Sequence, residues 1–195
     1  MRERRVIANL VLTLDGRTTG PGGPMDMSCI APHGVSDQAR DGLVQMTEAT
    51  TVLLGRNNYQ GFASYWPQVA RDQNAEPRDA AFARWLDDVE KVVFSRTLTT
   101  LEWTNSRLAE GEPATVVRAL RTEQGGDIRV LSSQSLIRQL LAADELDRFE
   151  LTLAPTIAGG GARLFDGSLP ASDWIVSDLT RTDSGAVRLA YDRAR

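Results

Sequence analysis

Small polar residues and arginines stand where several apolar, strand-like stretches of this sequence end. The segments VLLGRNNY, VVFSRTL and RVLSSQSL each pass from an apolar run into a polar turn. In an open α/β sheet, ligands bind beyond the carboxyl ends of parallel strands. Helix N-termini there favour phosphate, which an arginine can also grip with two hydrogen bonds. The three junctions together therefore predict a site for a phosphate-bearing cofactor.

The same residues also have ordinary structural interpretations. Gly55 suits a turn, Arg56 and Arg96 suit surface ion pairs, and Ser133 suits the N-cap of a helix. For any single junction these interpretations are the more frequent ones, and for Ser133 alone the cap is favoured. The segment IAGGGARLF adds three consecutive glycines, but the G-x-G-x-x-G fingerprint of dinucleotide sites is absent.

The sequence contains few of the residues that other functional classes require. The 195 residues include one His and one Cys, which cannot build the usual zinc sites, so we expect no metal. His33 lies in the loop segment APHGV and no G-x-S-x-G elbow occurs, which disfavours a Ser-His-Asp hydrolase. A net charge of −4 with scattered arginines disfavours nucleic acid. Without a long apolar run or signal region, we expect no membrane partner and a cytoplasmic protein.

Strand-like and helix-like stretches alternate along the chain, which is typical of an α/β fold with a partly parallel sheet. The strands are expected over 5–14, 50–55, 91–95, 128–131 and 149–155. Helices are expected over 36–48 with Ser36 as cap, 57–67, around 81–86, 113–124 and around 136–141. The polar stretch 70–79 is expected to be a loop, and the tail to form a hairpin turning at 183–185. The whole chain, 1–195, is expected to be one domain.

Taken in order, five segments resemble the dihydrofolate reductase-like superfamily. The resemblance is strongest to the reductase domain of riboflavin biosynthesis (RibD C-terminal type) and covers nearly the whole chain. The segments are LVLTLDGRTTGPGG, TVLLGRNNYQGFASYWP, KVVFSRTL, GGDIRVLSSQSLIRQLLAADELD and LTLAPTIAGGGARLF. The resemblance implies a single-domain fold with a central mixed, mostly parallel sheet of about eight strands, flanked by helices, with a C-terminal antiparallel hairpin. It also implies a homodimer.

The resemblance further implies an NADPH-dependent reductase that transfers hydride to a small heterocyclic, pteridine- or pyrimidine-like substrate. The implied activity is similar to that of 5-amino-6-(5-phosphoribosylamino)uracil reductase. By position in the motifs, the implied cofactor-binding residues are Gly55, Arg56, Asn57, Ser95, Arg96, Thr97, Ser132, Ser133, Gln134, Ser135, Leu136, Gly159 and Gly160. On this reading, the serines after residue 131 are small because a pyrophosphate needs the space.

For the catalytic step the resemblance implies Asp15, in the LDG motif, as a candidate proton donor, with water as the rival. Tyr59 and Trp66 are candidates for the substrate side, with core packing as the slightly favoured alternative. Three residues depart from the resemblance, and one of them, Arg148, stands where relatives tend to carry a glutamate. Ser132 stands where relatives usually have a glycine, and Ala39 stands where true dihydrofolate reductases carry a carboxylate. Folate reduction by that mechanism is therefore not expected.

The riboflavin-pathway substrate carries a phosphate, and Arg17 is the only loop candidate to receive it. Two other functional classes stay open from the sequence. One is a non-catalytic nucleotide-binding or dimeric structural module on the same fold. The other is an activity that depends on a flavin or reduces one.

Overall fold

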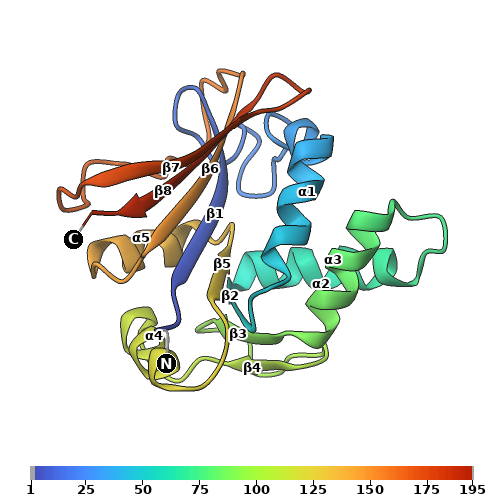
Figure 1. The fold of residues 1–195 in the computed structure, drawn as a ribbon, viewed down its shortest axis with the longest axis vertical. Helices are drawn as coiled ribbons and strands as arrows, with labels where there is room; N and C mark the ends of the chain where they lie inside the picture. The colour runs from blue at the N-terminus through green and yellow to red at the C-terminus, as the bar shows by residue number, and fades with distance from the viewer. Residues whose placement is uncertain (1–2, 195) are drawn as a thin grey trace.

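The computed structural model describes residues 3–194 as a sheet of eight strands with five α-helices packed on it (Figure 1). The strands are β1 (Val6–Thr13), β2 (Thr51–Gly55), β3 (Glu90–Phe94), β4 (Ser106–Leu108), β5 (Ile128–Leu131), β6 (Arg148–Ala154), β7 (Trp174–Arg181) and β8 (Val187–Arg193). The helices are α1 (Asp37–Met46), α2 (Arg56–Arg71), α3 (Pro77–Asp88), α4 (Pro113–Thr122) and α5 (Gln134–Ala142), with a short 3-10 helix η1 (Ala31–Gly34) before α1.

The strand order is β4-β3-β2-β5-β1-β6-β8-β7. Every pairing among β1 to β6 is parallel, whereas β8 runs antiparallel to both β6 and β7. The expected α/β class, mixed sheet and C-terminal hairpin are thus confirmed, and Gly185 takes the positive φ of 83° that the hairpin turn needs. Because β1 to β6 are parallel, their carboxyl ends meet at one edge of the sheet, where a ligand site is expected.

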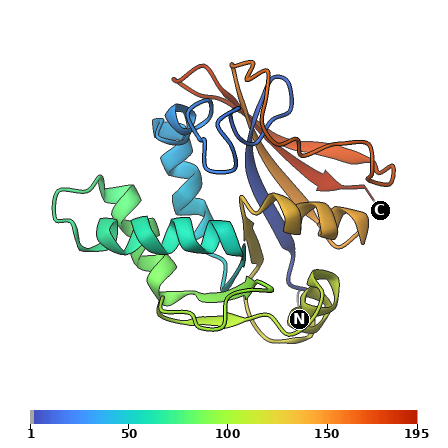
Figure 2. The same cartoon turned by 180° about the vertical axis from the view of Figure 1, so that it is seen from behind.

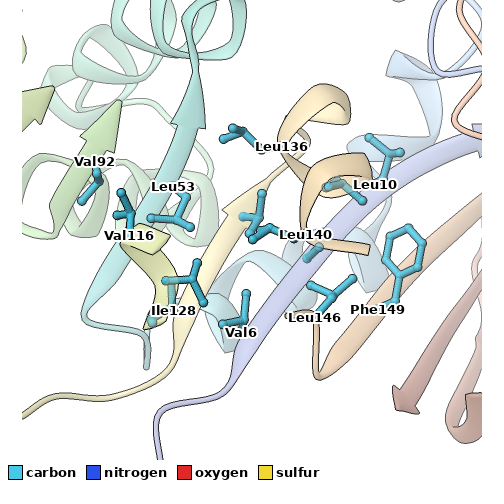
Figure 3. Packing of buried hydrophobic residues seen from close by; sticks show 14 of the residues in the cluster. Val6, Leu10, Leu53, Val92, Val116, Ile128, Leu136, Leu140, Leu146 and Phe149 are labelled. Carbon is cyan, nitrogen blue, oxygen red and sulfur yellow. The ribbon is translucent and has the colours of Figure 1, made fainter. Parts of the chain in front are cut away.

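Side chains of the central strands alternate between two faces and form two apolar clusters. Leu53 points into a cluster that α4 and α5 cover, which Figure 3 shows in close-up. Its neighbours Val52 and Leu54 point the other way, into a cluster with α1, α2 and α3. Fully burying one such side chain contributes about 1.5–3 kcal/mol relative to leaving it exposed. The two clusters hold the strand tips in place from both sides. Among the described residues, no helix has the length and apolar character that crossing a membrane requires.

Several element boundaries differ from the sequence-based expectation. Helix α2 does not end at the YWP segment but continues through Pro67 to Arg71. Pro67 has no amide to donate within the helix, and beside it Trp66 packs edge-on against Phe82 of α3, with ring centroids 4.9 Å apart. The loop expected over 70–79 is therefore shorter, residues 72–76, because α2 ends at Arg71 and α3 begins at Pro77. Strand β4 was missed because three residues are too short for a periodic pattern.

Candidate functional site

A cavity of about 1200 Å³ opens at the carboxyl edge of the parallel strands. Its walls come from the ends of β2, β3 and β5, the first turns of α2, α4 and α5, and the loop 18–30 that follows β1. In Figure 2 the N-termini of α2 and α5 lie close together near the strand tips, with the blue loop after β1 above them. The volume exceeds that of most sites for one drug-sized ligand, so it has room for a dinucleotide and a second molecule.

The helices that begin at this cavity are unusual in their first turns. Among the described residues, no side chain caps α2, α4 or α5, whose N-cap residues are Gly55, Glu112 and Ser133. Uncapped first turns leave backbone N–H groups available and place the positive ends of the helix dipoles at the cavity wall. This arrangement suits phosphate groups.

Ser133 corrects one expectation, because its hydroxyl is not a helix cap. Its side chain is buried, accepts a hydrogen bond from the Gly55 amide at 2.9 Å and donates one to the Leu131 carbonyl at 3.1 Å. The hydroxyl therefore ties the end of β2 to the end of β5. Ser133 lies behind the cavity wall and fixes how the first turns of α2 and α5 sit relative to each other.

Ser132 occupies a left-handed conformation with φ of 49°. A residue with a Cβ adopts this conformation at a cost of roughly 1–2 kcal/mol relative to glycine-like freedom. A glycine would adopt this conformation without that cost. The Asn58 side-chain amide donates to the Ser132 carbonyl at 3.2 Å, and the Ser132 amide donates to the Asn9 carbonyl at 3.1 Å. These bonds hold the turn although its residue type is unfavourable.

The other two predicted junctions also reach the cavity. Arg56, at the start of α2, is exposed and donates to the Thr97 hydroxyl at 3.0 Å and to the Asn57 side chain at 3.3 Å. The Ser95 hydroxyl accepts from the Thr97 amide, which shapes the turn after β3. Arg96 is exposed at the same turn. The structure thus brings both arginines to one rim, near the uncapped first turn of α2. The predicted cofactor residues that line the cavity are Gly55, Arg56, Asn57, Ser95, Arg96, Thr97, Ser132, Gln134, Ser135 and Leu136.

Gly159 and Gly160 do not line the cavity. Their segment packs against the loop after β1, and a Cβ on Gly160 would come within 2.9 Å of Pro21. The next residue, Gly161, does line the cavity, and a Cβ there would lie 2.0 Å from the Thr19 carbonyl oxygen. Gly160 and Gly161 are therefore needed for the two loops to approach each other this closely.

Asp15 is placed between these two loops and outside the cavity lining. Its carboxylate accepts hydrogen bonds from the Thr13 hydroxyl at 2.7 Å and from the amides of Ala158 and Gly159 at 3.0 and 3.1 Å. These bonds, above all the one from Thr13, hold the pKa of Asp15 well below its ordinary value. Arg17 pairs with the same carboxylate at 3.5 Å. A carboxylate that stays ionised and lies outside the cavity lining is unsuited to donate a proton there, so Asp15 acts as a clamp between the two loops.

The two candidate substrate residues behave differently. Tyr59 is only 5% exposed, its hydroxyl accepts from the Trp103 amide at 3.0 Å, and it belongs to the core, as the packing alternative foresaw. Trp66 lines the cavity. On α1, Asp37 and Asp41 both pair with Arg78 of α3 and stay outside the cavity lining.

The sequence predicted none of the lining residues in the loop after β1 and only some of those on α2. The α2 residues recur at spacings of three and four, a helical face that the sequence carries but that core packing explains equally well. The loop has no comparable signal. The missed lining residues include Thr18, Thr19, Pro21, Gly23, Pro24, Met25, Met27 and Ile30 of the loop, and Asn58, Gly61, Phe62 and Tyr65 of α2.

The fold and cavity can be compared with those of known proteins. The uncharacterized protein YyaP of Bacillus subtilis (strain 168) is 26% identical over 198 residues, covering 98% of this chain and 96% of its own length. A putative riboflavin biosynthesis protein from Shewanella sp. PV-4 has a TM-score of 0.71 at 19% identity, with 98% of this chain and 99% of that chain covered. A pyrimidine reductase-like protein from Corynebacterium diphtheriae has a TM-score of 0.66 at 15% identity, with 98% and 92% covered.

A third solved structure is the diaminohydroxyphosphoribosylaminopyrimidine deaminase/5-amino-6-(5-phosphoribosylamino)uracil reductase of Thermotoga maritima. It has a TM-score of 0.66 at 16% identity, and the match covers 98% of this chain but 57% of that longer one. At these identities the three structures support the fold alone. The family model described as the RibD C-terminal domain matches residues 4–188. The chain therefore belongs to the RibD C-terminal domain family.

Proposed function

We propose that this protein is an NADPH-dependent reductase that transfers hydride to a small conjugated or heterocyclic acceptor. The observation that carries the proposal is the composition of one continuous cavity. One part has uncapped helix N-termini and two exposed arginines, and the part between the loop after β1 and α2 carries mostly apolar side chains, together with Thr18, Thr19 and Asn58. Membership of a family whose riboflavin-pathway relatives include a uracil reductase supports the same class of reaction.

The residues present fit NADPH at the polar part. Arg56 and Arg96 would hold the phosphates of the adenosine half, including the 2′-phosphate, because a guanidinium matches phosphate with paired donors. The turn from Ser132 to Leu136 and the first turn of α5 would hold the pyrophosphate. When bound, NADPH supplies the hydride. The protein's own part is to hold the two reactants in the cleft in the orientation that hydride transfer requires.

The proton that completes the reduction comes from solvent in this proposal. The charged residues that line the cavity in the described chain are Arg56, Arg96 and Glu112, and none of them lies on the loop after β1. Asp15, the sequence-based candidate, is clamped outside it. An acceptor that gains a hydride on one atom and a proton from water on another needs no acidic side chain beside it.

A melting experiment tests the proposal. The protein is heated alone, with NADPH and with NADH, and unfolding is followed by fluorescence or calorimetry. A ligand at 100 times its Kd stabilises the folded state by about 2.7 kcal/mol, so NADPH is expected to raise the Tm clearly and NADH much less. If neither dinucleotide raises the Tm, the non-catalytic module is the better interpretation. A yellow purified protein would point to a flavin-dependent activity.

The homodimer that the family resemblance implies stays a prediction. The edge strand β7 leaves Ile175, Val176 and Leu179 more than half exposed, which is uncommon for an edge facing only water. Sedimentation velocity at several protein concentrations would measure whether a second copy covers it.

A further inference from the structure

The cavity has a second part whose lining differs from the cofactor part. The loop after β1 contributes Met25, Met27 and Ile30, and α2 contributes Phe62, Tyr65 and Trp66. We call these six residues the acceptor end. Met25 approaches α2 closely, since its terminal methyl lies 3.9 Å from where a Cβ on Gly61 would be. In Figure 2 the loop lies above α2, on the opposite side of that helix from the green segments after β3.

The acceptor end leaves an unusual amount of apolar side chain exposed around one opening. Met25 is 68% exposed, Tyr65 58% and Met27 44%. Single exposed apolar residues are common on protein surfaces, but several that share the rim of one cavity mark a binding site. Methionine is flexible and polarizable, and packs well against flat rings.

The aromatic wall behind the rim is held in place. Trp66 packs edge-on against Phe82 at 4.9 Å, against Tyr65 at 5.1 Å and against Phe62 at 6.3 Å between ring centroids. Edge-on contacts of this kind are favourable and fix ring orientation. The wall therefore offers preorganised aromatic surface against which a planar ligand can stack.

The loop after β1, which carries Met25 and Met27, also has a defined shape. The Asp26 carboxylate accepts hydrogen bonds from the Gly22 amide at 2.9 Å and from the Ser28 hydroxyl at 2.6 Å. A Cβ on Gly20 would lie 2.3 Å from that carboxylate, so the loop closes around it because this position is a glycine. Met25 and Met27 flank Asp26 and are carried to the rim by this turn.

The acceptor end offers a phosphate no cation. Among the described residues, the arginines in the cavity lining are Arg56 and Arg96 at the cofactor part. Arg17, the loop candidate for a substrate phosphate, pairs with Asp15 and donates to the Gly161 carbonyl at 2.7 Å, and it is not part of the lining. A phosphate brought into an apolar chamber without a partner loses hydration that nothing replaces.

We infer that the acceptor of this protein is an uncharged, planar, conjugated ring without a phosphate, bound between Met25 and the aromatic residues of α2. The inference rests on the proposed function, because hydride from NADPH adds to one atom of the conjugated ring while water protonates another. The electron pair enters the ring system, and NADP⁺ remains. Tyr65 and Met25 are then specificity-determining residues for the ring.

A matched pair of flavins tests this inference by binding alone. Lumiflavin is the uncharged isoalloxazine ring, and flavin mononucleotide is the same ring with a ribityl phosphate. Calorimetry first measures NADP⁺ binding to the whole chain, and each flavin is then titrated into protein saturated with NADP⁺, which blocks the cofactor part. Lumiflavin is expected to bind at least about tenfold more tightly than flavin mononucleotide. The reason is that the phosphate of flavin mononucleotide finds no cation at the acceptor end, which lowers the affinity by at least about tenfold.

Variants locate the site. Tyr65→Glu and Met25→Glu each place a charge at the exposed rim and are expected to weaken lumiflavin binding about tenfold or more, with NADP⁺ binding unchanged. Val35→Glu is the control, because Val35 is 56% exposed and lies outside the cavity lining. It is expected to leave lumiflavin binding unchanged.

The two proposals fail in different ways. If NADP⁺ does not bind, the proposed function fails, and the inference falls with it. If NADP⁺ binds but lumiflavin does not, or flavin mononucleotide binds as tightly or more tightly, the inference alone is overturned. Equal loss of lumiflavin binding in Val35→Glu and Tyr65→Glu would also overturn it, because the ring would then not bind at the acceptor end.

Discussion

The cofactor part of the cavity, here called the cofactor end, and the acceptor end present different kinds of groups to a ligand. At the cofactor end the binding groups are mostly backbone: the first turns of α2 and α5, with Arg56 and Arg96 beside them. At the acceptor end they are apolar side chains, and the rim residues Met25 and Tyr65 are largely exposed. A backbone site persists through wide sequence change because the fold supplies it, whereas a side-chain site changes with single substitutions. Under the proposed function, the fold therefore determines which cofactor binds, and a few side chains determine which acceptor binds.

The most direct test of this difference between the two ends is to remove the arginine side chains at the cofactor end. Arg56→Ala and Arg96→Ala are each expected to weaken NADPH binding by about 10- to 100-fold, the value of a hydrogen bond to a charged group. NADH lacks the 2′-phosphate and should lose much less. Calorimetric Kd values for both dinucleotides measure the difference.

Arg118→Ala is the matched control for these two variants. Arg118 is 62% exposed on α4, pairs with Glu145 and lies outside the cavity lining. It should leave both dinucleotides unaffected. If Arg56→Ala and Arg96→Ala weakened NADPH and NADH equally, the arginines would have no part in recognising the 2′-phosphate.

Much of the cofactor end was predictable from sequence because its signals are local. A short apolar run, a small or polar turn and a helical pattern fix a strand tip and a helix start, and parallel pairing brings such tips together. Arg56 and Arg96 lie at these turns, so their place at one rim followed from topology. The role of the Ser133 hydroxyl did not follow, because its partner Gly55 is remote in sequence and a cap is the commoner role.

The acceptor end was largely unpredictable because its positions depend on contacts between loops. Nothing in the sequence near Met25 indicates that Asp26 folds the loop around its own carboxylate, or that the loop lies on α2. Asp15 was assigned to chemistry because a carboxylate near the substrate loop suits a proton donor. Its actual partners include the amides of Ala158 and Gly159, distant in sequence, so only the folded chain reveals the clamp.

The Asp15 clamp tests whether the two ends share a common support. Asp15→Asn replaces two acceptor oxygens by one oxygen and a donor that faces backbone amides. We expect a lower Tm at neutral pH and a loss of a few-fold in both NADPH and lumiflavin affinity, because fewer molecules hold the competent loop arrangement. If one ligand alone is weakened, the clamp serves only that end of the cavity.

The pH dependence gives an independent check on the clamp. The folded-state pKa of Asp15 is depressed, so its contribution to stability is present above the ordinary carboxyl pKa of about 4 and is lost as the pH falls through the lower folded value. The difference in Tm between the wild type and Asp15→Asn is therefore expected to shrink as the pH is lowered below about 4. A difference that stays constant across that range would mean that the ionised carboxylate is not what holds the loops.

The smallest expected effect concerns Ser132, a residue with a side chain at a position of the cofactor end where the backbone conformation favours glycine. Ser132 holds a φ of 49°, where a glycine is favoured by roughly 1–2 kcal/mol, less the roughly 0.5–1 kcal/mol that glycine loses in unfolded-state entropy. Ser132→Gly should therefore stabilise the protein by about 0.5–1 kcal/mol in urea unfolding. Ser135→Gly, in the first turn of α5, should destabilise it, since no positive φ is relieved there. If both variants destabilised the protein, the Ser132 hydroxyl would stabilise the turn by more than its backbone conformation costs. The turn after β5 would then depend on a side chain as well as on its backbone.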